Sequence, residues 1–231
     1  MRYSKDHKAA THARIVQNAS AQLREKGARG VGVADLMKDV GLTHGGFYAH
    51  FGSREELVNE AIAAALDQNT ESWRKLVTGK PAEARAAALV DDYLSTRHRD
   101  NPRKGCALAS LAVDISREGA KTRRIFLNKL EGMVELLAAE DGRPPTSRER
   151  QKAFGAVATL IGALALARVA GSSALSGEIL EAGRAAVLDR NRVHSAREPA
   201  SRKRTPSAKP KRGAARPLAA NRAAERRHTR A

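Results

Sequence analysis

The side chains best suited to chemistry are concentrated in one short run of the sequence, THGGFYAH, at residues 43–50. It sets hydroxyl and imidazole groups around two adjacent glycines: Thr43, His44, Gly45, Gly46, Tyr48 and His50. Hydroxyl and imidazole groups both donate and accept hydrogen bonds, so the run is suited to binding a polar partner. Because each glycine costs a helix about 1 kcal/mol relative to alanine, the pair indicates a reason other than helix stability, such as close approach to a partner surface.

Catalytic and metal-binding patterns are missing from the sequence. It contains no nucleophile with a placed base, no paired carboxylates and no phosphate-binding loop, and the histidines outside the run, among them His7, His12 and His98, are scattered. No group of His, Cys and carboxylate residues has metal-ligand spacing. We therefore expect a binding protein that has no catalytic residues and uses neither a metal nor a cofactor.

Two short helices position the run. They are predicted over residues 33–40 and 44–50, with a sharp turn at Gly41, which can take the left-handed conformation, and with Thr43 as the cap of the second helix. A set of apolar residues has the spacing to form a small core with a preceding helix at 7–26: Leu36, Met37, Val40, Leu42, Phe47 and Phe51. In a helix-turn-helix, the N-terminal residues of the second helix enter the major groove of DNA. The sequence therefore predicts duplex DNA as the partner.

The remainder of the chain up to residue 189 also has helical periodicity, and strict alternation of apolar and polar residues is hard to find. Helices are predicted over residues 55–76, 83–98, 106–117, 121–140, 147–169 and 175–189. Ser53, with Glu56 three residues later, indicates a capping box at the start of the first of these. The predicted fold class is all-α, with a three-helix DNA-binding domain at residues 1–53 and a second helical domain at residues 54–189.

Residues 190–231 differ in composition from the rest. They hold 14 lysine and arginine residues against 2 acidic ones, so they carry most of the net charge of +17. With almost nothing apolar to bury, this segment is predicted to be a disordered basic tail. The tail either binds DNA phosphates without sequence preference or is a solvated extension without a role. In the first case, a nonspecific nucleoid-type DNA-binding protein is the alternative function.

The run LTHGGFYAHFGSREEL resembles the recognition helix and following cap of the TetR/AcrR family of bacterial transcriptional repressors. The resemblance implies a homodimer that pairs through its last two long helices, a palindromic operator in double-stranded DNA, and release by a small-molecule effector bound in the C-terminal domain. It predicts DNA contacts for Thr43, His44, Gly45, Gly46, Tyr48, His50 and Arg54. Of these, Tyr48, His50 and Arg54 match positions that contact the phosphate backbone, whereas Thr43 and His44 face the groove.

The resemblance also implies an effector pocket within residues 54–189. Apolar and aromatic residues on the helices that would surround it are Trp73, Tyr93, Leu94, Leu108, Leu111, Ile115, Phe126, Leu130 and Met133. The alternative for each of them is an ordinary core position. Small residues in the segment 154–169, FGAVATLIGALALARV, allow close helix packing and indicate either the dimer interface or a core helix.

Cys106 is the single cysteine. It is predicted to open a helix directly after Lys104 and Gly105, where the helix dipole and a nearby cation lower the pKa of a thiol. The run GCALASL is similar to one in TetR-like regulators that include sensors of electrophiles or oxidants, so a redox sensor is a further alternative function. The other interpretation is a small buried side chain. With one cysteine, no signal-peptide pattern and no apolar run of about 20 residues, we expect a cytoplasmic protein without a membrane partner.

Overall fold

The computed structural model describes residues 5–138 and 143–195, and within these ranges it contains helices and no strand. The N-terminal elements are α1 (Lys5–Lys26), α2 (Val33–Asp39) and the 3-10 helix η1 (His44–Ala49). They are followed by α3 (Arg54–Val77), α4 (Ala82–Tyr93), α5 (Thr96–Asp100), η2 (Pro102–Lys104), α6 (Ala107–Ile115), α7 (Ala120–Ala138), α8 (Ser147–Ala170) and α9 (Ala174–Ser195). The all-α fold class predicted from the sequence is therefore confirmed.

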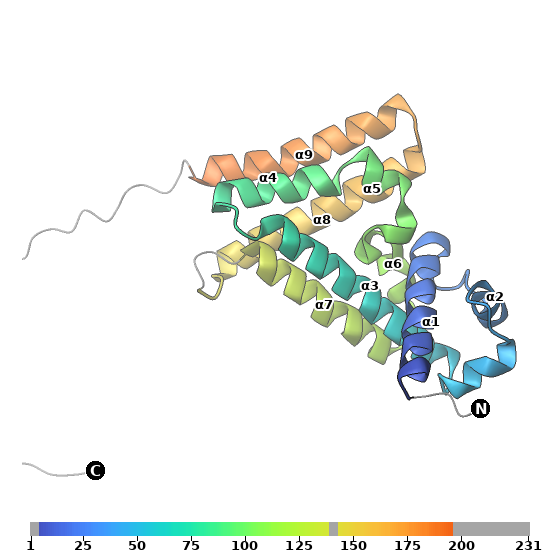
Figure 1. Ribbon diagram of the computed structural model, residues 1–231. Coiled ribbons are helices and arrows are strands. Elements are labelled where there is room, and N and C mark those ends of the chain that lie inside the picture. Colours follow the sequence, from blue (N-terminus) through green and yellow to red (C-terminus); the bar gives the residue numbers. More distant parts are fainter. Residues whose placement is uncertain (1–4, 139–142, 196–231) are drawn as a thin grey trace, which may run out of the picture. The chain divides into compact units, whose positions relative to one another are not determined.

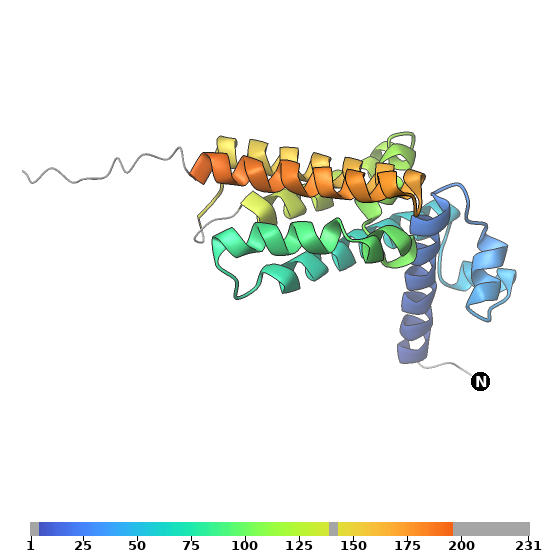
Figure 2. The same ribbon diagram turned by 90° about the horizontal axis from the view of Figure 1, so that it is seen from above.

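Helix α3 joins two groups of helices (Figure 1). On one side it packs against α1, beyond which α2 and η1 lie, and on the other side it packs against α7 and α4. Helices α8 and α9 run side by side, and α1 lies crosswise to them near one of their ends (Figure 2). The C-terminal end of α1 also contacts η2 and α6. The N-terminal elements are therefore tied to the rest through both α1 and α3.

The apolar stripe predicted for α1 is buried. Ile15, Ala19 and Leu23 lie in the core shared with α2, η1 and α3. Gly27 ends the helix with a φ of 78°, a left-handed conformation that glycine adopts without strain. The next backbone amide, that of Ala28, donates to Asp114 Oδ2 at 2.8 Å, so the end of α1 is attached to α6.

The cap of α3 differs in one detail from the capping box that the sequence predicts. Ser53 Oγ accepts a hydrogen bond from the Glu56 amide at 3.1 Å, as expected. The Glu56 carboxylate, however, accepts from the Gly52 amide at 2.7 Å and not from that of Ser53. The complete box occurs at α8, where Thr146 and Glu149 bond to each other's backbone amides.

The helix predicted over residues 83–98 is wrong in its length, because the chain breaks it into α4 and α5. Ser95 is extended and caps α5 by accepting from the His98 amide at 3.2 Å, while its hydroxyl donates to Asp92 O at 2.8 Å. The Arg184 guanidinium of α9 donates to Leu94 O. Hydrogen bonds from the side chains of Ser95 and Arg184 therefore hold the break.

The predicted boundary of the basic tail is also wrong, because α9 continues past residue 189 to Ser195. Most of the predicted tail, from residue 196 onward, lies outside the described residues. The division into domains at residue 53 stays a prediction. Helix α3, which starts at Arg54, packs against α1 of the predicted first domain and against α4 and α7 of the second.

Within residues 5–138 and 143–195, α8 is the helix long and apolar enough to cross a membrane by length and composition, with a mean hydropathy of 1.9. It packs against α9, α7 and α6. Only 28% of its apolar window is buried, however, so much of an apolar helix is left uncovered. Apolar residues on its exposed side are spaced by three or four positions: Phe154, Ala158, Gly162, Leu166 and Val169.

Candidate nucleic-acid interface

The turn between α2 and η1 is built as the sequence predicts. Gly41 has a φ of 72°, and its amide donates to Lys38 O at 2.9 Å, while the Leu42 amide donates to Met37 O at 2.8 Å. Thr43 is extended and its Oγ1 accepts from the Gly46 amide at 3.3 Å, which makes it the cap of η1. The turn therefore fixes where the second helix begins.

The second element is a 3-10 helix of six residues, shorter and tighter than the predicted helix over 44–50. Its hydrogen bonds run to the third residue back, from Gly46 to Thr43 O at 3.0 Å and from His50 to Phe47 O at 2.9 Å. A 3-10 geometry is usual for such short pieces, and two glycines weaken any longer α-helix.

Two phenylalanines hold η1 against the core. Phe47 and Phe51 are 2% and 1% exposed, and their rings stack with centroids 5.4 Å apart. They pack with the buried side chains of Ile15, Leu36 and Met37 from α1 and α2. The predicted core is thus confirmed, except that Val40 and Leu42 are only partly buried at its edge.

The opposite side of η1 faces solvent. Thr43, His44 and Gly45 are exposed, and Tyr48 is 68% exposed. The His44 and Tyr48 rings meet edge to face, with centroids 6.0 Å apart. A β-carbon placed on Gly45 would meet nothing within 4 Å, so no contact among the described residues requires a glycine there. This fits a requirement imposed from outside, by a partner that approaches the backbone closely.

His50 lies partly behind this surface. Its Nδ1 is buried and has no hydrogen-bond partner among the described residues, and its ring lies 6.0 Å from that of His12. Burial lowers the pKa of His50, and the neighbouring charges of His12 and Lys8 lower it further. His50 therefore favours the neutral form, so it is suited to a hydrogen bond with a phosphate and less to a charge pair.

His12 is a neighbour of this surface that sequence reasoning missed. It stacks on Phe51, with ring centroids 4.5 Å apart, and its Nε2 lies 2.6 Å from Glu60 Oε2. The contact links α1, the end of η1 and α3. No local pattern could have identified it, because Glu60 lies 48 residues along the chain from His12.

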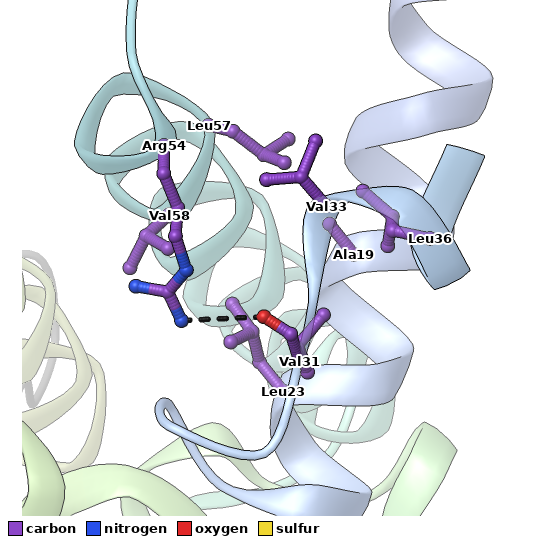
Figure 3. A pocket seen from close by; sticks show the side chains of 8 residues that line it. All are labelled: Ala19, Leu23, Val31, Val33, Leu36, Arg54, Leu57 and Val58. Atoms are coloured by element: carbon purple, nitrogen blue, oxygen red, sulfur yellow. Dashed lines mark hydrogen bonds between the residues drawn. The ribbon is translucent and has the colours of Figure 1, made fainter. Parts of the chain in front are cut away.

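The Arg54 guanidinium, predicted to contact DNA phosphates, is bound through one of its nitrogens to this protein's own backbone, and the DNA contact stays a prediction. Arg54 Nη2 donates to Ala28 O at 2.6 Å. It also donates to Val31 O at 3.3 Å (Figure 3). It thereby holds the loop between α1 and α2. The cavity drawn around it has a volume of about 10 Å³, which is the size of one water molecule and too small for an effector.

The residues predicted to line an effector pocket are packed as core. Trp73, Tyr93, Leu108, Leu111 and Phe126 are all buried, and Leu130 is partly buried. The Trp73 and Tyr93 rings meet edge to face, with centroids 5.7 Å apart. The two cavities described for this structure are lined by other residues. The predicted pocket stays a prediction.

The expectation of a lowered pKa for Cys106 is wrong. The side chain is 1% exposed, and burial raises the pKa of its thiol. Cys106 is the N-cap of α6, and its backbone amide donates to His98 Nε2 at 2.8 Å. A buried thiol with a raised pKa is a poor nucleophile, so this environment does not favour a sensing role.

Comparisons with known proteins agree with this geometry. The family model described as "Bacterial regulatory proteins, tetR family" matches residues 15–61, from within α1 to the first turns of α3. An uncharacterized HTH-type transcriptional regulator of Mycobacterium tuberculosis is 28% identical over 171 residues, covering 68% of this chain and 83% of that protein. The HTH-type transcriptional repressor KstR2 of the same organism is 29% identical over 86 residues, covering 36% of this chain and 43% of KstR2.

Solved structures share the whole fold. A TetR transcriptional regulator from Chloroflexus aurantiacus superposes with a TM-score of 0.66 at 22% identity, covering 80% of this chain and 95% of that one. The reduced form of Escherichia coli NemR superposes with a TM-score of 0.65 at 19% identity, covering 77% and 95%. Residues 15–61, which include the helix-turn-helix, thus match the DNA-binding part of the TetR family, and the relatives support a DNA-binding transcriptional regulator. The solved structures show that the fold is shared.

Proposed function

We propose that the protein is a homodimeric repressor that binds a palindromic operator through η1 and is released by a small-molecule effector. The observation that carries the proposal is the surface of η1, where exposed polar side chains and an exposed glycine lie over two buried phenylalanines. The similarity of 86 residues of the chain to a repressor, KstR2, supports the direction of regulation.

In this proposal, Thr43 and His44 contact base edges in the major groove, since they begin the second helix of the motif. Tyr48 and His50 bind phosphate oxygens and set the position of η1 on the duplex. Arg54 supports them indirectly, because it holds the loop between α1 and α2 in place. The glycine pair allows the backbone to approach the DNA.

The dimer would form through the uncovered side of α8 together with α9. Leu166 and Val169 are 60% and 87% exposed, and a β-carbon on Gly162 would meet nothing within 4 Å. An exposed apolar stripe on a helix with small residues suits close packing against a second copy of the same helix. Two copies of η1 would then lie about 34–36 Å apart, one turn of DNA, and require a palindrome.

An effector that releases DNA must bind one arrangement of the dimer more tightly than the other. A cytoplasmic metabolite could act as this effector. The proposal therefore places the protein in the cytoplasm, without a membrane partner. Neither a metal nor a cofactor is needed for DNA binding or for release in this mechanism, and the proposed activity is binding, not catalysis.

Selection of bound sequences from random duplexes tests the proposal. We expect a discrete palindromic site with two half-sites. Fluorescence anisotropy would then compare that site with a scrambled duplex for His44→Ala and for the matched control Arg74→Gln, an exposed residue of α3 that pairs with Glu71. Loss of one base contact costs about 1–3 kcal/mol of discrimination, so His44→Ala lowers the preference for the site at least fivefold and the control leaves it unchanged.

Two results would contradict the proposal. Selection that returns no common site would favour the nonspecific nucleoid-type protein. Equal preference for the selected site in His44→Ala and in the parent would mean that His44 does not recognise bases. If the triple variant Thr43→Ala, Tyr48→Phe, His50→Gln also kept this preference, η1 would not be the DNA-reading element.

A further inference from the structure

An open cleft lies where the end of α1 meets α5, α6 and the end of α8. Its volume is about 390 Å³, enough for a metabolite of moderate size. The polar lining includes three arginines, Arg24, Arg99 and Arg168, and two acids, Glu25 and Asp100. None of the predicted effector-pocket residues lines it.

Arg24 is a buried cation of the DNA-binding part. It is 6% exposed, and its guanidinium donates to three neutral oxygens: Ser20 O at 3.2 Å, Gly105 O at 3.2 Å and Gln68 Oε1 at 3.1 Å. Burial lowers the pKa of Arg24, which means that its contacts do not fully offset the loss of hydration of the charged guanidinium.

Arg168 enters the same place from α8. Its guanidinium donates to Arg99 O at 3.3 Å, to Ser110 Oγ at 3.0 Å and to His98 O at 3.2 Å, again all neutral oxygens. Burial lowers the pKa of Arg168 as well. Each of the two guanidinium groups has five N–H donors, so donors remain for a ligand.

The acids of the cleft are already paired with other cations. Asp100 binds Arg99, with Nε to Oδ1 at 2.7 Å, and Glu25 binds Arg103 at 2.6 Å. No described carboxylate lies within 4.0 Å of the nitrogens of Arg24 or Arg168. Two positive charges, one buried and one partly buried, therefore line one open cleft without an acidic partner, and an anion is the missing partner.

Gly105 is a neighbour of both arginines. Its carbonyl accepts from Arg24, while a β-carbon on it would lie 2.5 Å from Arg168 Nη2. Its φ of −79° suits any residue, so the backbone conformation does not require glycine. The space that a side chain would take at residue 105 is occupied by the Arg168 guanidinium and the His98 ring.

We propose that this cleft binds a small organic oxyanion, with a carboxylate or phosphate group held by Arg24 and Arg168, and that this anion is the effector of the regulator. The regulatory part rests on the proposed function. Arg24 belongs to α1, against which the DNA-reading elements α2 and η1 pack, and Arg168 belongs to α8, the proposed dimer helix. An anion bound to both would favour one orientation of α1 relative to α8 and so shift the spacing of the two DNA-reading motifs.

Thermal unfolding of the full chain tests binding, with citrate as the carboxylate probe, pyrophosphate as the phosphate probe and KCl at equal ionic strength as the reference. Anions attracted to the basic tail bind the folded and the unfolded chain alike, so they do not raise Tm. Anions bound in the cleft bind only the folded chain. At ten times its Kd, either probe should raise Tm by about 3–6 °C over KCl.

Two cleft variants and one control separate binding from folding. Ser110→Asp places a carboxylate beside Arg168 Nη1. Without added anion, the Tm of this variant should equal or exceed that of the parent. Citrate and pyrophosphate should then no longer increase it. Arg168→Gln should also lose the rise, and Arg74→Gln should keep it. No rise for the parent with either probe, or an equal rise for the parent and Ser110→Asp, would overturn the site.

DNA binding is then measured separately on the selected duplex. For the parent, citrate or pyrophosphate should change the Kd for DNA at least threefold relative to KCl, and for Ser110→Asp it should not. An equal change in both would overturn the cleft as the effector site. If the parent shows the Tm rise but no site-specific DNA binding without anion, the anion site stands and the proposed repressor function fails.

Discussion

The Nε2 atom of His98 accepts the hydrogen bond that the backbone amide of Cys106 donates, at 2.8 Å. On the other side of the ring, Nδ1 lies 2.7 Å from Tyr93 O, to which it donates. Both bonds together require the neutral imidazole with its proton on Nδ1. His98 thus connects the break between α4 and α5 to the start of α6.

This arrangement predicts that acid weakens the fold through His98. Burial is the largest influence and lowers the pKa of His98, whereas the bond to Tyr93 O, which comes next, raises it. The charges of Arg168 and Arg97 lower the pKa further, and that of Asp92 raises it, with a net lowering. The unfolded chain therefore binds more protons, and the stability due to neutral His98 is complete above the ordinary pKa of about 6.5. It is lost as the pH falls from there through the lowered pKa of the folded state.

Urea unfolding of the parent and of His98→Gln checks this. The difference in free energy of unfolding should be about 1–3 kcal/mol above neutral pH, the cost of leaving the Cys106 amide without its acceptor. It should shrink as the pH falls below about 6.5. Comparing the two proteins cancels the contribution of His50, whose pKa is also lowered. A difference that stays constant over this range would refute the role of the His98 charge.

Neighbouring residues of η1 should separate folding from DNA binding. Phe47→Ala removes a ring that is 2% exposed, so it should cost about 3–5 kcal/mol of stability. Tyr48→Ala removes a ring that is 68% exposed and should change stability by less than about 0.5 kcal/mol while it weakens DNA binding. Urea unfolding and anisotropy on the selected duplex measure the two effects. Equal losses of stability would mean that the two rings are not on opposite sides of the motif.

The sequence predicts the DNA-binding part of this fold well, because its determinants are local. Gly41 needs a left-handed conformation, Thr43 caps the next element, and Phe47 and Phe51 are four residues apart on one face. Each of these features acts within a few residues, so a pattern in the sequence is enough to find them.

The parts that the sequence could not predict depend on distant partners. Arg54 bonds to carbonyl groups 26 and 23 residues away, and Arg168 bonds to oxygens 58 to 70 residues away. An arginine has the same local signature whether it faces a phosphate or a carbonyl of its own chain. For the same reason, apolar residues such as Trp73 could not be assigned to a pocket or to the core before their neighbours were known.

Leu166→Glu should convert the proposed dimer to a monomer. The side chain is 60% exposed in the single chain, so a charge there should hardly affect folding, but it would be buried in a dimer interface without a partner. The matched control is Leu127→Glu on α7, where leucine is 55% exposed. Light scattering over a range of concentrations should give a dimer for the parent and the control. A parent that is monomeric at micromolar concentration, or a dimeric Leu166→Glu, would exclude this interface.

Removal of residues 196–231 should flatten the salt dependence of DNA binding. Because α9 continues to Ser195, a cut after that residue keeps the helix intact. It removes 12 basic and 2 acidic residues. Each phosphate contact that is lost makes the slope of log K against log salt concentration less negative by about 0.9.

Preference for the selected palindrome over a scrambled duplex should survive the cut, because the residues of η1 are untouched. Affinity for the scrambled duplex should fall most at low salt, where release of counterions contributes most to binding. Anisotropy titrations at several salt concentrations give both quantities. An unchanged slope would show that the basic segment makes no phosphate contacts, and loss of the preference itself would mean that sequence recognition depends on this segment and not on η1 alone.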